Sequence, residues 1–239
     1  MNLSNKVAIV TGGRRGIGRG IVIALKEAGA TIINIGIVKP EEQIADKFIC
    51  RDLSVRESRL NLIDNIVNGF GRLDILINNA GRQACHEAID YPIEQWDYSL
   101  ELLLTAPFDL SQQAASIMAV MGGGKIVNIG SIASFQGARK ICAYIAAKHA
   151  LIGLTRALAV EWAKYNILVN AVVPGFIDTD MLRSLADDPV RGEQAKKRIP
   201  LNRWGTPADV ANACMYLISP GADYITGTCL MVDGGWLAR

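Results

Sequence analysis

Short apolar segments alternate with segments of helical periodicity along the whole chain. The apolar segments predict strands at residues 6–11, 31–35, 47–50, 73–78, 125–130, 167–174 and 228–233. The periodic segments predict helices at residues 17–28, 54–71, 94–119, 143–164 and 206–218. Strands that are apolar on both faces and alternate with helices are typical of a parallel sheet covered on both sides. The pattern therefore predicts a doubly wound α/β domain spanning residues 1–239.

No linker-like change of composition, low-complexity segment or internal repeat divides the chain. The least regular segment is 175–205, which is rich in charge and contains Pro189 and Pro200. A long irregular segment in a compact α/β domain usually serves function, often as a lid over the site. We therefore expect a substrate loop at about 175–205.

The composition is that of an ordinary globular enzyme. Half of the residues are hydrophobic, and 25 Lys and Arg stand against 23 Asp and Glu, so no nucleic-acid partner is indicated. Five scattered cysteines are typical of reduced thiols, and His86 and His149 have no partners at metal-ligand spacing, so no metal is expected. The chain shows neither a signal peptide nor an apolar run of about 18 residues. We therefore expect a cytoplasmic protein that does not enter the membrane.

The segment YIAAK, Tyr144–Lys148, places a phenol and an ammonium four residues apart in an apolar helix. Positions i and i+4 lie on one helix face, so the two groups meet there. If they are buried, the lysine charge lowers the pKa of the tyrosine from its usual value of about 10, and the pair can transfer protons. Taken alone, these five residues favour a core tyrosine beside a lysine that reaches solvent.

A glycine-rich turn, TGGRRGIG at residues 11–18, lies between the first predicted strand and the first predicted helix. Gly12, Gly16 and Gly18 permit a tight turn and the close approach of a pyrophosphate to the helix N-terminus. Their spacing differs from the common GxGxxG fingerprint, so the turn by itself is weak evidence. Its position after the first strand nevertheless favours a dinucleotide site.

The TGxxxGxG form of this turn resembles that of the short-chain dehydrogenases/reductases, and three further motifs of that family follow in the same order. They are similar to the family's NNAG, to its Ser followed by YxxxK, and to its PG motif. They lie at Asn78–Gly81, at Ser131 with Tyr144 and Lys148, and at Pro174–Gly175. The resemblance runs from the first strand to the final DGGW. Four ordered motifs are highly specific, and they favour chemistry over core packing for Tyr144 and Lys148.

The resemblance implies a Rossmann-type fold and hydride transfer between a nicotinamide cofactor and a secondary alcohol or ketone. Tyr144 is then the general acid/base, Lys148 lowers its pKa and holds the nicotinamide ribose, and Ser131 binds the reacting oxygen. The family's cofactor contacts carry over to Gly12, Arg14, Arg15, Gly16, Ile17, Gly18, Asp52, Leu53, Asn79, Ala80, Gly81, Tyr144, Lys148, Pro174, Gly175, Ile177 and Thr179. Members of the family are usually tetramers, so a homo-oligomer is expected.

One position departs from the family's pattern. Aligning residues 96–108 with the family's long helix places Leu103 where an asparagine helps to hold a water beside the lysine. A leucine side chain cannot form that hydrogen bond, although the backbone carbonyl can. A cofactor-binding protein without turnover therefore stays open as an alternative. The intact Ser131, Tyr144 and Lys148 favour the enzyme.

The end of the second predicted strand decides between NAD and NADP. The family's NAD-selecting acid would fall at Gly36, and no acidic residue occurs between residues 31 and 40. Arg15 matches an arginine of NADP-using relatives, and Arg14 and Lys39 add positive charge. We therefore favour NADP(H), with NAD(H) as the alternative.

The substrate is indicated only by a finer resemblance. Residues 134–137 and 198–209 and the ending DGGWLAR are most similar to the sugar-acid branch, which includes 2-dehydro-3-deoxy-gluconate 5-dehydrogenases and gluconate dehydrogenases. A carboxylate substrate needs a cationic partner, for which the candidates are Arg82, Arg139, Arg183 and Arg191, with solvated surface charge as the alternative for each. Gln83 and His86, just after the NNAG motif, are candidates for contact with the substrate. The shared motifs do not separate this branch from 3-oxoacyl or cyclic ketone reductases, which stay open as alternatives.

Overall fold

A seven-stranded parallel sheet forms the centre of the protein. The computed structural model describes residues 1–239, with the side chain of Ser184 as the one exception. The strands are β1 (Val7–Thr11), β2 (Thr31–Gly36), β3 (Lys47–Cys50), β4 (Ile75–Asn78), β5 (Gly124–Ile129), β6 (Ile167–Pro174) and β7 (Cys229–Val232). Their order across the sheet is β3-β2-β1-β4-β5-β6-β7, and all neighbouring pairs are parallel. The order reverses between β1 and β4, which is where folds of this kind bind ligands.

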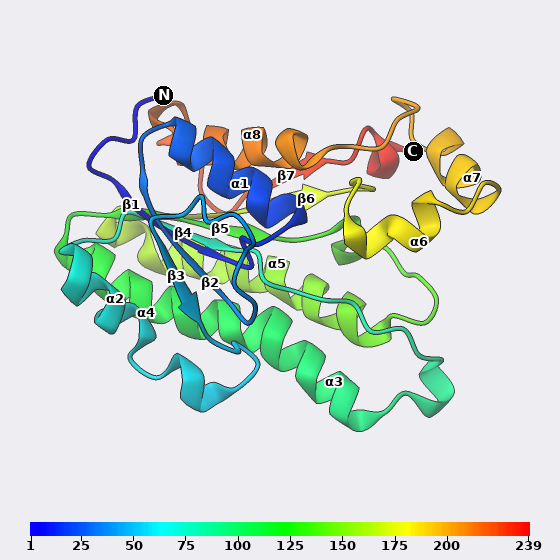
Figure 1. The fold of residues 1–239 in the computed structure, drawn as a ribbon, viewed down its shortest axis with the longest axis horizontal. Helices are drawn as coiled ribbons and strands as arrows, with labels where there is room; N and C mark the ends of the chain where they lie inside the picture. The colour runs from blue at the N-terminus through cyan, green and yellow to red at the C-terminus, as the bar shows by residue number, and fades with distance from the viewer.

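Helices cover both faces of the sheet (Figure 1). They are α1 (Gly16–Glu27), α2 (Leu62–Phe70), α3 (Ile93–Leu100), α4 (Ala106–Val120), α5 (Cys142–Trp162), α6 (Arg183–Ala186), α7 (Arg191–Lys197) and α8 (Pro207–Ile218). Helices α1 and α8 pack together over one core, which contains Leu25 and Val210. Helices α2, α4 and α5 pack over a second core, which contains Ile66 and Leu158. The predicted doubly wound, Rossmann-type α/β fold is confirmed.

The central strands are buried along their whole length because helices cover both of their faces. All residues of β1 and β4 are buried, which agrees with their continuous apolar pattern. Several polar side chains in this core are hydrogen-bonded to one another, although Asn78 Oδ1 has no partner among the described residues. Asn78 Nδ2 donates to Asn128 Oδ1 over 2.9 Å, and Asn128 Nδ2 donates to Thr155 Oγ1 over 2.9 Å. These hydrogen bonds connect β4, β5 and α5 near the ends of the strands.

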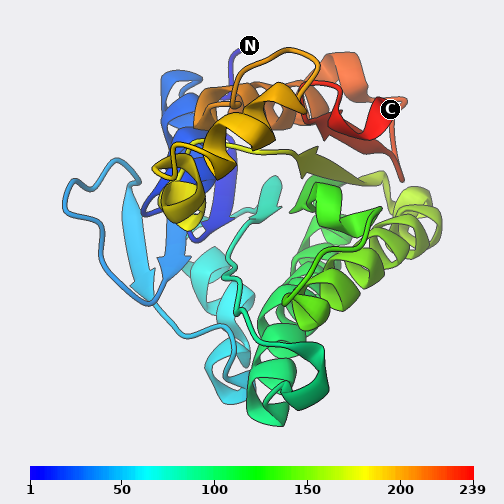
Figure 2. The same ribbon diagram turned by 90° about the vertical axis from the view of Figure 1, so that its right-hand side faces the viewer.

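The connection from β2 to β3 contains no helix. Residues 37–46 form bends and coil, as the proline and polar residues of this stretch indicate, and the segment is too short for a helical crossover. Strand β3 lies at the edge of the sheet without a fully buried residue. Ile37 and Val38 are exposed beside it, and Figure 2 shows the loop standing away from the sheet at the left. This edge of the sheet is therefore open to solvent.

The predicted helix at 54–71 is wrong in its first half. A 3₁₀ turn comes first, and α2 begins after Asn61, whose φ of 51° lies in the left-handed region. The cause is Arg59, whose side chain is fully buried and forms ion pairs with Glu101 and Asp109. The local periodicity of a sequence cannot show such a pairing with a distant helix.

The predicted helix at 94–119 forms, but it is irregular. Helices α3 and α4 are joined by a π-helical segment, Glu101–Thr105, in which the N–H of Ala106 donates to the carbonyl of Glu101. Pro107 supplies no N–H to the carbonyl of Leu103, so the ordinary α-helical hydrogen bond is missing at this point. The wider π turn accommodates the proline, and such segments are frequent at functional sites.

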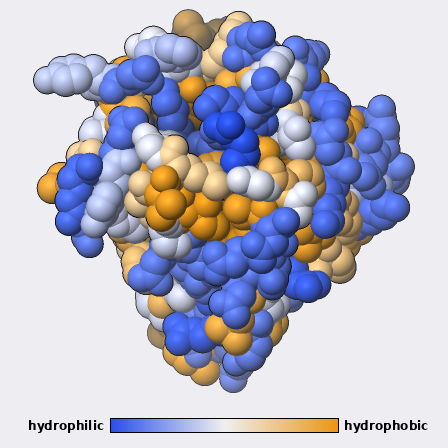
Figure 3. All heavy atoms as spheres, turned by 90° about the vertical axis from the view of Figure 1, so that its left-hand side faces the viewer, coloured by the Kyte–Doolittle hydropathy of each residue, from blue (hydrophilic) through white to orange (hydrophobic). Residues whose placement is uncertain are grey.

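The segment 175–205 contains two short helices, α6 and α7, and is therefore more ordered than its composition predicts. It leaves the sheet at the end of β6 and returns to α8, so both helices stand over the edge at which the strands end (Figure 2). At the opposite end of the molecule, where the strands begin, hydrophilic side chains surround a hydrophobic centre (Figure 3).

Candidate active site

A cleft of about 800 Å³ opens at the edge of the sheet where the strands end. Its walls come from segments that are far apart in the sequence, including the turns after β1, β4, β5 and β6 and the first half of α5. All the residues predicted to be catalytic or to bind the cofactor line this cleft, namely Gly12, Arg14, Arg15, Gly16, Ile17, Gly18, Asp52, Leu53, Asn79, Ala80, Gly81, Ser131, Tyr144, Lys148, Pro174, Gly175, Ile177 and Thr179. The fold therefore brings the four motifs to one place.

Tyr144 and Lys148 lie on one face of α5, as their spacing predicts. The Nζ atom of Lys148 lies 5.7 Å from the centre of the Tyr144 ring and donates to the carbonyl oxygen of Ile129 over 2.5 Å. Only 6% of the Lys148 surface is exposed. The lysine is therefore enclosed beside the tyrosine, and the alternative of a lysine that reaches solvent is wrong.

Ser131 begins the turn after β5 and is held there by reciprocal hydrogen bonds. Its hydroxyl oxygen accepts from the N–H of Ala133 over 3.1 Å, and its own N–H donates to the hydroxyl of Ser134 over 3.3 Å. The two bonds form a capping box around the short 3₁₀ turn Ile132–Ser134. This fixes the Ser131 backbone at the point where its side chain meets Tyr144.

The surroundings shift the pKa values of both titratable groups. Desolvation raises the pKa of Tyr144, and the neighbouring Ser131 hydroxyl offsets only part of that rise. Desolvation also lowers the pKa of Lys148 from its ordinary 10.5 to about 8. The direction of the pKa shift of Tyr144 is opposite to that expected from the charge of Lys148, because burial is the larger cause and the hydrogen bond with Ser131 opposes it only in part.

Leu103 contributes to this dry environment. Its side chain is 1% exposed, lines the cleft and packs so tightly on Gly81 that a Cβ there would lie 2.8 Å from Leu103 Cδ2. The π-helical segment that carries it packs against α5, the helix of Lys148. An apolar side chain therefore stands at the position where the family has a polar one.

The glycine turn has the shape that a bound pyrophosphate requires. A Cβ on Gly18 would lie 2.2 Å from the carbonyl oxygen of Gly12, and a Cβ on Gly12 would lie 2.9 Å from the Cα of Ala80. Gly12 and Gly16 also have positive φ values of 72° and 53°. Side chains are thus excluded, and the backbone around the start of α1 is left open to the cleft. These residues fit the diphosphate of a dinucleotide.

Two polar side chains hold this turn in place. The Oδ1 atom of Asn34 accepts from the N–H of Gly13 over 2.8 Å, and Asn34 itself lines the cleft. The hydroxyl of Thr11 accepts from the N–H groups of Asn79 and Ala80 over 2.9 Å each. The turn after β1 and the turn after β4 are therefore joined. The role of Asn34 could not be predicted, because Asn34 lies inside an apolar strand without a motif of its own.

Three arginines in the turns after β1 and β3 line the cleft, as does Gly36: Arg14, Arg15 and Arg51. Arg51 was missed by the sequence interpretation, and its position directly after β3 is the signal that could have revealed it. Lys39, proposed as a further cation, does not line the cleft. Arg15 forms an exposed ion pair of 3.2 Å with Asp180.

The structure separates the candidate substrate residues into two groups. Arg82, Gln83, Arg139 and Arg191 line the cleft, whereas Arg183 and His86 do not. Arg183 is paired with Asp180 over 3.3 Å. His86 packs edge-on against Tyr91, with 5.2 Å between ring centres.

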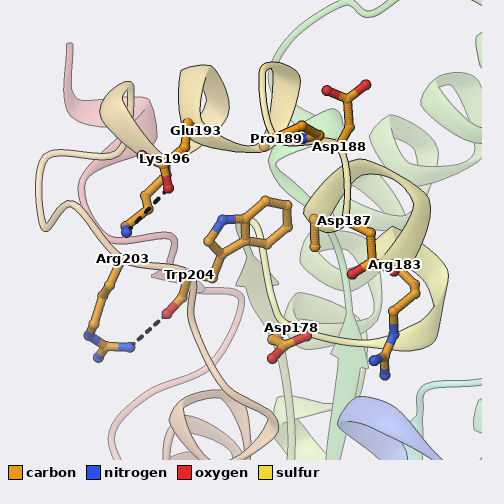
Figure 4. Close-up of a pocket in the computed structure, with 11 residues that line it drawn as sticks. Asp178, Arg183, Asp187, Asp188, Pro189, Glu193, Lys196, Arg203 and Trp204 are labelled. Atoms are coloured by element: carbon orange, nitrogen blue, oxygen red, sulfur yellow. Dashed lines mark hydrogen bonds and ion pairs between the residues drawn. The ribbon is translucent and has the colours of Figure 1, made fainter.

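Arg183 belongs to a second, smaller cavity of about 520 Å³ beneath α6 and α7 (Figure 4). The indole of Trp204 stands in its middle, surrounded by charged side chains, among which Lys196 and Glu193 form an ion pair of 3.5 Å. The guanidinium of Arg203 donates to the carbonyl oxygen of Trp204 over 3.0 Å. The cavity therefore lies within residues 178–204 and is lined largely by charged side chains.

The cleft carries a strong positive charge. Its basic residues are Arg14, Arg15, Arg51, Arg82, Arg139, Lys148 and Arg191, and its acidic residues are Asp52 and Asp180. A concave surface of one sign attracts ligands of the opposite sign. Within the described part of the chain, no helix is long and apolar enough to cross a membrane.

Comparison with known proteins assigns this arrangement to a family. A family model described as enoyl-(acyl carrier protein) reductase, which belongs to the short-chain dehydrogenases/reductases, matches residues 12–237. The chain therefore belongs to the short-chain dehydrogenases/reductases, which are oxidoreductases that use nicotinamide cofactors.

Among its relatives are the 2-dehydro-3-deoxy-D-gluconate 5-dehydrogenases of Dickeya dadantii and Bacillus subtilis. Both are 40% identical over 100% of this chain and over 98% and 97% of their own. A solved structure with a TM-score of 0.95 is that of a candidate NAD(P)-dependent gluconate 5-dehydrogenase of Beutenbergia cavernae with bound NADP at low occupancy. It is 38% identical, and the match covers 100% of this chain and 99% of that one.

Proposed function

We propose that the chain is an NADP(H)-preferring dehydrogenase that interconverts a secondary alcohol and a ketone on a sugar acid. The observation that carries this proposal is the enclosed Tyr144–Lys148 pair, with Ser131 beside it, in a cationic cleft that begins at a glycine turn shaped for a diphosphate. The sugar-acid relatives support the choice of substrate.

The chain's own residues supply the proton chemistry. When bound, the nicotinamide accepts or supplies the hydride. In alcohol oxidation the Tyr144 phenolate accepts the proton of the alcohol and becomes the phenol, and in ketone reduction the phenol gives its proton to the ketone oxygen and becomes the phenolate. The Ser131 hydroxyl donates a hydrogen bond to the reacting oxygen. The Lys148 ammonium stabilises the tyrosinate, which forms only briefly because desolvation otherwise favours the neutral phenol. The carbonyl of Leu103, which Pro107 leaves without its usual helical donor, is the candidate acceptor for the relay to solvent.

The preference for NADP(H) rests on positive charge in the turns after β1 and β3. Arg14, Arg15 and Arg51 line the cleft there, and Gly36 stands where an NAD-selecting acid would lie. Guanidinium groups bind phosphate bidentately, so they suit a 2′-phosphate. The exposed pair of Arg15 with Asp180 contributes little and yields readily to a phosphate. NAD(H) remains the alternative cofactor.

Two further features complete the proposal. Residues 175–205, with α6 and α7, act as the substrate lid over the cleft.

A second copy of the chain packs against α4 and α5, on which Phe108 and Val160 are exposed, as the first step toward a tetramer in the cytoplasm. Light scattering coupled to size exclusion tests the assembly, and a monomer at micromolar concentration would contradict it.

The test of the function is nicotinamide absorbance with NADP⁺ and NAD⁺ in separate series, across sugar acids, neutral polyols and simple secondary alcohols. We expect reduction of NADP⁺ by at least one sugar acid, and a weaker response for NADP⁺ in an Arg15→Ala variant. Turnover of 3-oxoacyl or cyclic ketones alone would identify the other branch of the family. Cofactor binding without turnover of any compound would identify a cofactor-binding protein without activity. The lack of turnover would then be attributed to Leu103.

A further inference from the structure

A residue near the C-terminus reaches the cleft through one glutamine. The indole Nε1 of Trp236 donates a hydrogen bond to the Oε1 atom of Gln136 over 3.0 Å, across 100 positions of sequence. Gln136 lies in the loop after β5, five residues beyond Ser131, and lines the cleft. Trp236 does not line the cleft and therefore stands behind Gln136.

Trp236 is held firmly in this position. Its side chain belongs to a buried cluster with Ile132 and Ile199 and is 7% exposed. The ring of Phe176 packs at 4.7 Å, and the guanidinium of Arg198 lies over the indole at 4.4 Å. Such stacking and cation–π contacts fix the plane of the ring.

The turn before Trp236 is fixed as well. Asp233 accepts from the N–H of Gly235 through Oδ1 and from the N–H of Leu237 through Oδ2, each over 2.9 Å. Gly234 and Gly235 have positive φ values of 64° and 88°, and a Cβ on either would press against the lid at Ile199 or Pro200. The indole N–H is thus aimed by the backbone and not only by side-chain packing.

The chemistry of the indole decides which end of the Gln136 amide faces the cleft. An indole nitrogen is a donor only, so its partner must be the amide oxygen. The two hydrogens on Gln136 Nε2 then point away from Trp236. Among the described residues, Nε2 has no hydrogen-bond partner in the protein. Gln136 therefore presents a donor, and not an acceptor, to whatever the cleft binds.

The charges around Gln136 favour an anionic acceptor. Arg139 follows it by three residues in the same loop, lines the cleft and forms no ion pair with any described residue. Arg191, at the start of α7, approaches the same cleft from the lid. The two acidic residues of the cleft lie in other segments, Asp52 after β3 and Asp180 after β6. A carboxylate matches one amide donor and nearby guanidinium groups.

We propose that Gln136 and Arg139 bind the carboxylate of the substrate and that Trp236 is the positioning residue that orients the Gln136 amide for this contact. The inference rests on the proposed function, since it names the residues that select an acid within the same site. Gln136 donates through Nε2, Arg139 adds charge, and Trp236 excludes the flipped amide, which would aim an oxygen at the carboxylate.

Gln136→Glu and Gln136→Leu test the contact. The glutamate still accepts from Trp236 but presents a second oxygen to the substrate, and the leucine removes the donor. The probes are D-gluconate, or the sugar acid turned over fastest, and the polyol in which its carboxylate is a hydroxymethyl group. We expect kcat/KM for the acid to fall by about twentyfold or more beyond any fall for the polyol, with the larger effect for Gln136→Glu. Gln112→Glu makes the same change on an exposed face of α4 and is the control.

Trp236→Phe tests the positioning role, because it keeps an aromatic ring and removes the N–H. We expect a higher KM for the acid, an unchanged affinity for NADP⁺ and a melting temperature close to that of Trp96→Phe, a control outside the cleft. In a Gln136→Leu background, Trp236→Phe should have no further effect on that KM, since the tryptophan acts through the glutamine. Additive effects of the two changes would overturn the positioning role.

The failures of the two proposals are distinguishable. A wild-type protein that shows no turnover dependent on Tyr144 overturns the proposed function and this inference with it. An active wild-type protein whose KM for the acid is the same in Gln136→Leu overturns this inference alone. Equal losses of kcat/KM for the acid and the polyol would show that Gln136 shapes the cleft without contacting the carboxylate. That result would also overturn this inference.

Discussion

Two regions of the cleft are stabilised by different interactions. We call the part at Ile129, Tyr144 and Lys148 its floor, and residues 175–205 are its proposed lid. On the floor, Lys148 donates to the carbonyl of Ile129 in a nearly dry environment. Behind the floor, the core residue Asn128 is hydrogen-bonded on both sides. In the lid, the ion pairs of Asp180 with Arg15 and Arg183 have side chains that are 48–63% exposed. Exposed pairs contribute about 0–1 kcal/mol each, whereas a buried polar group left unpaired costs about 1–3 kcal/mol.

This difference in stabilisation matches a difference in role between the residues that transfer the proton and those that admit the substrate. The floor is fixed by contacts that cannot be lost singly without a penalty, so its reacting groups stay in register. The exposed ion pairs of the proposed lid cost little to break, so we expect this segment to rearrange when substrate enters. Substitutions in the floor should therefore have larger effects than substitutions in the proposed lid.

Lys148→Met should have the largest effect on turnover. The methionine fills the same dry space but carries no charge to stabilise the tyrosinate. We expect kcat to fall by about two to four orders of magnitude, the range for loss of acid–base assistance. Steady-state kinetics checks this, and a variant with a tenth of the wild-type rate would show that the floor does not depend on this charge.

Gly18→Ala should disrupt the glycine turn. The new Cβ would meet the carbonyl oxygen of Gly12 at 2.2 Å, so the turn must shift. We expect a loss of about 3 kcal/mol of stability and weaker cofactor binding, as for overpacking of a rigid core. Gly153→Ala is the matched control, since a Cβ there has no neighbour within 4 Å, and it should stabilise α5 by about 0.5–1 kcal/mol. Equal melting temperatures for the two variants would contradict the close packing of the turn.

The buried Lys148 should also make stability depend on pH. Its pKa falls from 10.5 to about 8 on folding, so between these values the unfolded chain holds a proton that the folded protein lacks. The free energy of unfolding should therefore rise with pH across this window, by up to about 3 kcal/mol relative to Lys148→Met. Denaturant titrations of both proteins from pH 7 to about 10.5 measure the difference. Parallel curves would mean that Lys148 keeps its ordinary pKa.

Leu103→Asn should move the pH dependence of turnover. The π-helical segment that carries position 103 packs against α5, the helix of Lys148. We expect an amide at position 103 to relieve part of the desolvation of Lys148 and so to raise its pKa toward 10.5. The fall of kcat on the basic side, where the ammonium is lost, should then shift to higher pH. Leu103→Met keeps the site apolar and should leave this limb in place. A shift common to both variants would reflect repacking rather than polarity.

Arg183→Ala should have the smallest effect. The side chain is exposed and its only ion pair is with Asp180 at 3.3 Å, among the described residues. We expect a change of less than about 0.5 kcal/mol in the free energy of unfolding. A loss of 2 kcal/mol would show that the lid is held as tightly as the floor and would remove the contrast between them.

The motifs of the site could be predicted because each is short and sets its own backbone. The glycines of 12–18 determine a turn by their lack of side chains, and Tyr144 and Lys148 are brought together by the pitch of one helix. What could not be predicted depends on contacts between distant segments. Arg59 breaks a regular helical pattern because it pairs with Glu101 and Asp109, and no local pattern contains that information.

The same limit applies to the substrate side. Arg82 and Arg139 line the cleft, whereas Arg183 turns to a neighbouring cavity, although all three looked equivalent in the sequence. The bond between Gln136 and Trp236 joins residues in two different motifs of the same branch, and only the fold shows that they meet. The residues of the proton chemistry could therefore be predicted from local sequence motifs, whereas the residues that select the substrate could not.

The most direct test of the central claim compares wild-type protein with Tyr144→Phe at saturating NADP⁺ and sugar acid. The variant loses one hydroxyl and keeps the ring, so it should fold and bind NADP⁺ with an unchanged dissociation constant. We predict that its rate of nicotinamide reduction falls at least about a hundredfold. A rate within tenfold of wild type, in protein that binds the cofactor normally, would contradict the assignment of Tyr144 as the proton donor and acceptor.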